Sequence, residues 1–321
     1  PAGMEFDPAQ MRNVMDDFWA LVFSDTAVAK FTHTVSSAWV VAGVFVIGVS
    51  CWFLLKRRNV EMAMDSIKIA GWVGGAGILI TLATGDMSAV NVAKHQPMKL
   101  AAMEGLYDGS RGQELVAVGL LNPSKNVDNN EDPYLFHISI PYGLSFLATH
   151  DPHAFVPGIN DLINGIEINE AGDTVKTVGY NERIAIGKEA HEALRAYDKA
   201  MAAGDNAAMA EAEKELRSKY EYFGYGYFDS ANEAIPPVAM TFYAFRIMVI
   251  AGGYLLLFFA IALFAAYKKP SWLKNKVVNW IGMLSIVVVW VCSQSGWITA
   301  EVGRQPWVIQ NLMPTRAAIS H

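Results

Sequence analysis

Three side chains in apolar parts of the sequence have the chemistry of metal ligands or proton carriers: His33, Met248 and Glu301. A side chain that can ionise or coordinate is costly inside an apolar span, so each is a candidate functional residue. A histidine and a methionine on different helices can coordinate one heme iron from opposite faces, which is typical of low-spin electron-transfer centres. Each side chain could instead have a purely structural role. His33 could be a hydrogen-bonded histidine at a helix end, Met248 could be a packing residue, and Glu301 could form an ion pair with Arg304.

The depth of each candidate in the membrane can be estimated from its separation along the chain from the lysine at the opposite end of its span. The separations along the chain are 23 residues from His33 to Lys56, 20 from Met248 to Lys268, and 25 from Glu301 to Lys276. At about 1.5 Å per residue these are roughly 34, 30 and 37 Å, and a hydrocarbon core is about 30 Å thick. The three candidates therefore lie at one level, near the outer boundary of a membrane.

Four apolar segments are long enough to cross a bilayer, which takes about 20 residues. They are 36–55, the shorter and glycine-rich 69–84, 238–267 and 277–299. Of the 321 residues 53% are hydrophobic and only 17% are charged, so we predict an all-α polytopic transmembrane bundle of four spans rather than a set of buried core helices. The small residues of 69–84 suit close helix packing. The net charge of −6 gives no basic stripe, which excludes nucleic acid as a partner.

Positive charge orients the spans. The turn between the first two spans holds Lys56, Arg57, Arg58 and Lys68 against two acidic residues. The turn between the last two spans holds Lys268, Lys269, Lys274 and Lys276 and no acidic residue. Both turns should face the cytoplasm, and residues 88–237, with 12 Lys and Arg against 22 Asp and Glu, should lie outside. We therefore expect three parts: residues 1–87 (an outer amphipathic segment and two spans), 88–237 (an extracytoplasmic loop) and 238–321 (two spans and an outer C-terminal segment).

The outer loop has the pattern of a folded insert. The string IEINEAGDTVKTV alternates like a β-hairpin around residues 171–173. Residues 186–220 are predicted to form a hairpin of two helices separated at 204–206. Ahead of the first span, residues 8–23 are amphipathic and are expected to lie along the outer interface.

Other residues with reactive side chains receive no functional role. Cys51 and Cys292 lie in apolar runs without metal-site spacing, so we expect small core residues. Three histidines fall in the loop and are assigned no role: His95, His137 and His191.

Several motifs are distributed along the chain: KFTHTVSSAW, GDMSAV, KLAAMEGLYD, FYAFRIMV and GWITAEVGRQPW, in this order. Their content and order resemble subunit I of cytochrome bd quinol oxidase. The string GWITAEVGRQPW at 296–307, followed by NLMPT at 311–315, resembles the signature of that family. The strings KFTHTVSSAW, GDMSAV, KLAAMEGLYD and FYAFRIMV resemble it as well. The likeness covers essentially the whole chain, and GRQPW in this context is a very specific marker.

The resemblance implies heme-binding roles. His33 and Met248 correspond to the axial ligands of a low-spin heme, b558. Glu301 corresponds to an iron ligand in the high-spin pair, heme b595 and heme d, with the choice between the two left open. The remaining residues matched to the heme environment, where arginines can neutralise propionates, are Arg246, Arg304 and Trp297.

Lys99 and Glu104 match positions that the family ties to quinol oxidation in the outer loop, its Q-loop. Quinol oxidation releases two protons, so a carboxylate acceptor is chemically sensible. The two residues are five apart, about 140° around a helix, and do not share one face. They could flank a bound headgroup, or they could be solvated surface charges.

The implied function is that of the heme-containing subunit of a respiratory terminal oxidase in the bacterial cytoplasmic (inner) membrane. Ubiquinol or menaquinol is oxidised at the outer face, and electrons pass through the low-spin heme to the high-spin pair, where O2 is reduced to water. Releasing protons outside and consuming them from inside builds a gradient without pumping. The expected partners are subunit II, small accessory subunits where present, and membrane lipid.

The family's subunit has further helices before residue 1 and after the NLMPT motif, and nothing here resembles them. We therefore expect a fragment that is active only within the full-length complex. Two other functions stay open. A quinol-linked membrane b-type cytochrome would only transfer electrons and would have no task for GWITAEVGRQPW. A transporter or structural scaffold would contain no heme; transporters usually place polar residues near mid-membrane, whereas the candidates here lie at the outer edge.

Overall fold

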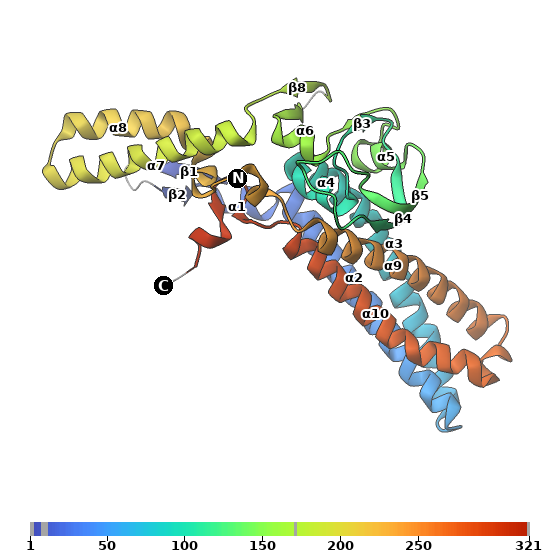
Figure 1. The fold of residues 1–321 in the computed structure, drawn as a ribbon. Helices are drawn as coiled ribbons and strands as arrows, with labels where there is room; N and C mark the ends of the chain where they lie inside the picture. The colour runs from blue at the N-terminus through green and yellow to red at the C-terminus, as the bar shows by residue number, and fades with distance from the viewer. Residues whose placement is uncertain (1–2, 8–11, 170–171, 320–321) are drawn as a thin grey trace. The chain divides into compact units, whose positions relative to one another are not determined.

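The computed structural model describes residues 3–7, 12–169 and 172–319 (Figure 1). The chain clusters into two compact units. The helical unit comprises Pro1–Glu5, Val14–Ala89 and Ala244–Ile298, and the loop unit comprises Phe6–Asn13, Val90–Tyr243 and Thr299–His321.

Four long helices carry the apolar segments: α2 (Asp25–Leu55), α3 (Val60–His95), α9 (Val238–Tyr267) and α10 (Lys276–Val302). Each is long and apolar enough to cross a membrane, which confirms the predicted architecture. The helices α2 and α3 extend well beyond the predicted spans, because polar residues at their ends continue the backbone hydrogen bonding. The hydroxyl of Ser24 caps α2 by accepting from the N–H of Ala27 at 3.4 Å.

Glycines allow the helices of the helical unit to approach closely. A Cβ atom on Gly43 would lie 2.9 Å from the Cα of Gly74, and one on Gly74 would overlap the ring of Phe259. The core around them is aliphatic and aromatic, and includes Val44, Ile47, Ile67, Leu255 and Phe259. The expected packing role of the small residues in 69–84 is confirmed.

The outward faces of these helices carry many large apolar side chains, among them Phe45, Trp72, Leu257 and Trp290. Apolar exposure on this scale is typical of surfaces that contact lipid or other helices. Both thiols are free, with Cys51 buried and Cys292 half-buried, in agreement with their prediction as small packing residues.

The loop unit is built from short helices and two-stranded antiparallel ladders. Its α-helices include α4 (Pro97–Glu104), α5 (Gly143–Thr149), α6 (Ile159–Ile163), α7 (Tyr180–Ala203) and α8 (Asn206–Lys219). Its 3-10 helices include η1 (Tyr220–Tyr227), η2 (Ala231–Ala234) and η4 (Thr315–Ala317). The helical unit adds η3 (Trp272–Lys274).

The ladders among the described residues of the loop unit include four pairs. They join β3 (Ser110–Arg111) to β6 (Phe155–Val156), β4 (Leu115–Leu121) to β5 (Tyr134–Ile140), β7 (Ile166–Ile168) to β8 (Thr174–Lys176), and β9 (Trp307–Ile309) to β10 (Met313–Pro314). The rings of Tyr225, Phe228 and Trp307 meet edge to face in the core of this unit.

Both predicted hairpins of the loop are confirmed. The ladder β7–β8 pairs Glu167 with Val175 around a turn whose residues 170–171 lie outside the described residues. The two predicted helices are α7 and α8. Between them Gly204 ends α7 at a φ of 70°, and the carboxylate of Asp205 caps α8.

The amphipathic segment 8–23 is only partly helical. Its residues 8–11 lie outside the described residues. The strand β2 (Arg12–Met15) pairs with β1 (Met4–Asp7), and the short helix α1 (Phe18–Val22) follows, capped by Asp17. The side chains of Trp19 and Phe23 are exposed, and their contact with a membrane surface stays a prediction.

Candidate functional site

His33 lies on α2 and is held by α3. Its Nδ1 atom is 3.0 Å from the hydroxyl oxygen of Thr84. Because that hydroxyl donates its own hydrogen to the carbonyl of Ile80 at 2.9 Å, its oxygen accepts from Nδ1–H. The lone pair of the imidazole is then on Nε2. A hydrogen bond that fixes the other ring nitrogen is the usual support of a metal-ligating histidine.

Met248 lies on α9 and faces α10. The thiol of Cys292 donates to the carbonyl of Met248 at 3.5 Å. A Cβ atom on Gly296 would lie 3.0 Å from the Met248 sulfur, so a larger residue there would crowd the thioether. The ring of His33 also has a glycine neighbour, Gly85, whose Cβ would lie 3.6 Å from Cε1. A neutral imidazole nitrogen and a thioether sulfur are the donor set of a low-spin heme, so the chemistry of these two side chains suits that role, which stays a prediction.

Two further residues matched to the heme environment lie in the helical unit. Arg246 is buried, and its guanidinium carbon lies 5.2 Å from the centroid of the Phe245 ring. Burial of the arginine differs from a snorkelling side chain, which keeps its charge in water. Trp297 follows Gly296 on α10 and is exposed. The roles of both residues stay predictions.

Glu301 and Arg304 form an ion pair near the end of α10. Both Nε and Nη2 of Arg304 donate to Oε2 of Glu301, at 2.9 and 2.6 Å. Lys99 is close to the same segment, because its Nζ donates to the carbonyl of Ala300 at 3.0 Å. The loop unit thus brings the KLAAME and GWITAEVGRQPW motifs together.

Glu104, at the end of α4, is the most buried of the candidate residues, with 2% of its surface exposed. The helix ends there because Gly105 adopts a φ of 63°. The hydroxyl of Tyr134 on β5 donates to the Glu104 carbonyl at 2.6 Å.

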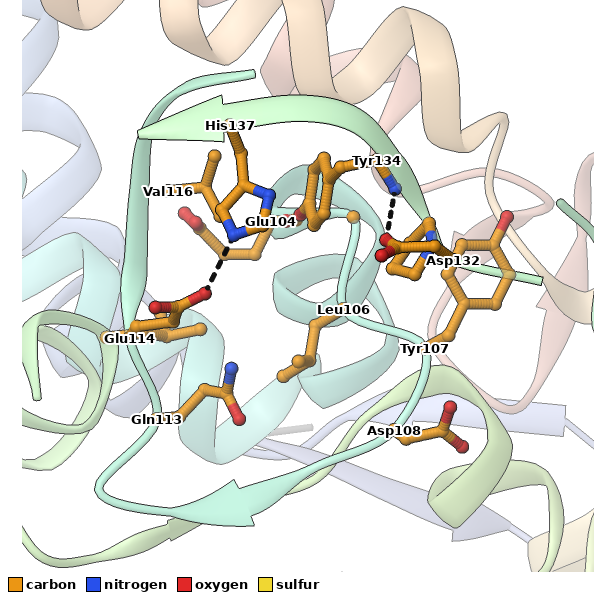
Figure 2. A pocket seen from close by; sticks show the side chains of 13 residues that line it. Glu104, Leu106, Tyr107, Asp108, Gln113, Glu114, Val116, Asp132, Tyr134 and His137 are labelled. Carbon is orange, nitrogen blue, oxygen red and sulfur yellow. Dashed lines mark hydrogen bonds and ion pairs between the residues drawn. The ribbon is translucent and has the colours of Figure 1, made fainter. Parts of the chain in front are cut away.

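Glu104 lines a partly open cavity of about 290 Å³ whose wall includes residues of α4, β4, β5 and the loop between α4 and β4 (Figure 2). The cavity wall is rich in oxygen donors and acceptors: Glu104, Tyr107, Asp108, Gln113, Glu114, Asp132 and Tyr134. Burial raises the pKa of Tyr107, so its hydroxyl stays protonated over an extended pH range and can donate. Such a space suits one aromatic headgroup with two hydroxyls, since pockets for whole ligands measure about 300–1,000 Å³.

His137 is a residue of this cavity that the sequence did not single out. Its Nε2 lies 3.3 Å from Oε1 of Glu114, and Figure 2 shows this pair beside Glu104 in the cavity wall. The hydroxyl of Ser139 donates to the other carboxylate oxygen of Glu114. No sequence signal indicated the pair, because it forms only when β4 and β5 align.

Comparisons with known proteins agree with the motifs. The model of the family described as cytochrome bd terminal oxidase subunit I matches residues 1–321. Cytochrome bd-II ubiquinol oxidase subunit 1 of Escherichia coli (strain K12) is 32% identical over 322 residues, covering 100% of this chain and 60% of that protein. Cytochrome bd ubiquinol oxidase subunit 1 of Bacillus subtilis (strain 168) is 28% identical over 313 residues, covering 96% of this chain and 52% of that protein.

The fold is also similar to a solved structure, the bd oxidase from Geobacillus thermodenitrificans. The TM-score is 0.67 at 20% sequence identity, and the match covers 98% of this chain and 55% of that chain. The chain therefore spans between about half and three-fifths of the length of these relatives.

Proposed function

Because the chain belongs to the family of cytochrome bd terminal oxidase subunit I, we propose that it carries the quinol-oxidising and heme-binding part of a membrane quinol oxidase. In the full-length complex, two quinols and one O2 give two quinones and two waters. The quinol is a ubiquinol or a menaquinol. Subunit II, and accessory subunits where present, complete the enzyme.

The proposed quinol site is the cavity beside Glu104. The single observation that carries it is that the carboxylate matched to quinol oxidation is 2% exposed and lines a space of headgroup size. A carboxylate in such a position can accept a proton from a quinol hydroxyl as the electrons leave. Tyr107 also lines the cavity and can contact the headgroup.

The proposed low-spin heme, b558, would be held by Nε2 of His33 and the sulfur of Met248. Bound there, it would supply one-electron redox chemistry, with a potential raised by the thioether. The hydrogen bond from His33 to Thr84 would keep the imidazole in its ligating tautomer. Glu301, paired with Arg304, would serve the high-spin pair of heme b595 and heme d.

The proposed topology follows the charges. Both lysine-rich turns face the cytoplasm, residues 88–237 form the extracytoplasmic Q-loop, and the chain lies in the bacterial cytoplasmic membrane. Residues 1–87 and 238–321 contribute the spans on either side. Protons from quinol are then released outside, whereas those for water formation come from inside. This separation builds a gradient without a pump.

Two experiments on the full-length complex test the proposal. A pyridine hemochrome spectrum should show both b-type and d-type heme, whereas a b-type electron carrier would show only the first. Replacing Glu104 with Ala should slow quinol oxidation while O2 reduction from an artificial electron donor continues. Equal loss of both activities would assign Glu104 a structural role and overturn the quinol site.

A further inference from the structure

Oxidation of one quinol releases two protons, but the proposed function gives only one acceptor, Glu104. The cavity contains three other carboxylates: Asp108, Glu114 and Asp132. Asp108 accepts from the amide of Asn160 at 2.8 Å, and Asp132 accepts from the backbone N–H of Tyr134 at 2.9 Å. Both bonds hold local structure in the cavity wall. The remaining carboxylate, Glu114, faces His137 (Figure 2).

The pair of His137 and Glu114 has the arrangement of an oriented base. The carboxylate of Glu114 is fixed by the hydroxyl of Ser139 on one oxygen and lies 3.3 Å from Nε2 of His137 on the other. A neutral imidazole that donates Nε2–H to a carboxylate has its lone pair on Nδ1. The carboxylate also stabilises the imidazolium that forms when Nδ1 takes up a proton.

Glu104 and the pair of His137 and Glu114 differ in how far they are exposed to solvent. Glu104 is 2% exposed, whereas the side chains of His137 and Glu114 are 35% and 41% exposed. A proton received by the imidazole can therefore pass directly to water. Glu114 and Tyr134 contact the imidazole, Tyr134 with its ring centroid 5.0 Å from that of His137. The other titratable groups that line the cavity are the carboxylates of Glu104, Asp108 and Asp132 and the phenol of Tyr107. The lining side chains include no Lys or Arg, so nothing cationic in the wall opposes protonation.

We propose that His137, oriented by Glu114, is the second proton acceptor of quinol oxidation and the route by which protons leave the cavity. This inference rests on the proposed quinol site. Both hydroxyl O–H bonds of the quinol break. One proton forms an O–H bond on Glu104, the other forms an N–H bond at Nδ1 of His137, and two electrons pass singly to a heme-type acceptor. Quinone remains, and the imidazolium gives its proton to water. The neutral imidazole then takes up the proton from Glu104 and passes it to water in turn, so both acceptors are restored.

The test uses the full-length complex with ubiquinol-1 and, separately, menadiol as substrates. In the wild type, kcat/KM should rise with pH across the range in which histidines titrate, about pH 5–8. His137→Gln should lower kcat about 100-fold, the low end for general acid–base catalysis, and abolish this rise. Its affinity for ubiquinone-1 by calorimetry, its heme spectrum and its O2 reduction from an artificial donor should stay within threefold of wild type.

Two further variants complete the test. Glu114→Gln should lower kcat about tenfold, and Glu114→Asp should restore most of it, because a carboxylate rather than an amide is needed beside the imidazolium. His153→Gln, which changes an exposed histidine of the same unit outside the cavity, should behave as wild type.

The outcomes separate this inference from the proposed function. If Glu104→Gln loses quinol oxidation while His137→Gln keeps the wild-type rate and pH profile, the quinol site stands and the role of His137 is overturned. If Glu104→Gln oxidises quinol normally, the quinol site itself fails. Should His137→Gln not assemble, a flat wild-type profile between pH 5 and 8 with both substrates would still overturn the inference.

Discussion

The ring of Phe259 on α9 occupies the space that the missing side chain of Gly74 leaves on α3. The ring is almost completely buried, so it cannot swing aside to admit a methyl group. Gly75 is the next residue of the same helix, and a Cβ there would lie 3.8 Å from Leu263, an ordinary contact. The two neighbouring glycines therefore have different structural roles.

We predict that Gly74→Ala destabilises the helical unit by about 1–3 kcal/mol, the usual cost of overpacking a core. Gly75→Ala should be neutral or stabilise by up to about 1 kcal/mol, because alanine favours a helix. Thermal unfolding of the purified full-length complex measures both. Equal midpoints for the two variants would contradict the packing derived from the α3–α9 contact.

Arg183 supports the loop unit. It is buried, and it donates to Oε1 of Glu167 at 2.5 Å and to the carbonyl of Val178 at 2.7 Å. Burial acts to lower the pKa of Arg183, but Tyr225 and Glu167 outweigh it, and the pKa is raised. The guanidinium is therefore charged at every physiological pH.

Replacing Arg183 with Met should destabilise the loop unit by about 3 kcal/mol, the lower end of the range for breaking a buried ion pair, because Glu167 stays partly exposed. Arg217→Met removes an exposed i,i+4 partner of Glu213 and should cost less than about 0.5 kcal/mol. The rates of hydrogen exchange of the α7 amides, measured in the full-length complex, compare the two variants. An equal change of exchange in both variants would contradict the supporting role of Arg183.

His191 gives the helical hairpin a pH dependence. Its ring lies between those of Phe223 and Tyr227, and its Nε2 is 3.0 Å from the Phe223 carbonyl. Burial lowers its pKa below 6.5, although the bond to Phe223 acts in the opposite direction. The unfolded state then binds the proton more tightly, so stability is full above pH 6.5 and falls as the pH drops towards the folded-state pKa.

We expect protection of the η1 amides, corrected for intrinsic exchange, to be lower at pH 5.5 than at pH 7.5. His191→Gln keeps a hydrogen-bond donor without titrating in this range, so its protection should be nearly independent of pH. An identical pH dependence in this variant would assign the effect to another group.

Composition and hydropathy predicted the four helices but not their ends. The apolar stretch of α2 begins near Ser36, whereas the helix begins at Asp25, because polar residues extend a helix without any change in hydropathy. The hairpin of α7 and α8 was predictable because Gly204 and Asp205 provide a local stop and start. Local signals of this kind are present in the sequence itself.

The cavity was only half predictable. Glu104 lies in a recognisable motif, but His137 and Glu114 are 23 residues apart and meet through the pairing of Leu115 with Ile140. The strand β4 is a short apolar run that periodicity cannot distinguish from a helix, and a long polar loop replaces the tight turn that marks a hairpin. Long-range pairing of this kind leaves no local signal.

Heme ligation by His33 and Met248 is the central proposal, because electrons from the proposed quinol site need an acceptor. The most direct test is the reduced-minus-oxidised absorbance spectrum of the full-length complex carrying Met248→Leu, compared with Met240→Leu, which changes an exposed methionine of the same helix. We predict that the low-spin b-type signal is lost in Met248→Leu and retained in Met240→Leu. An unchanged low-spin signal in Met248→Leu would contradict the account.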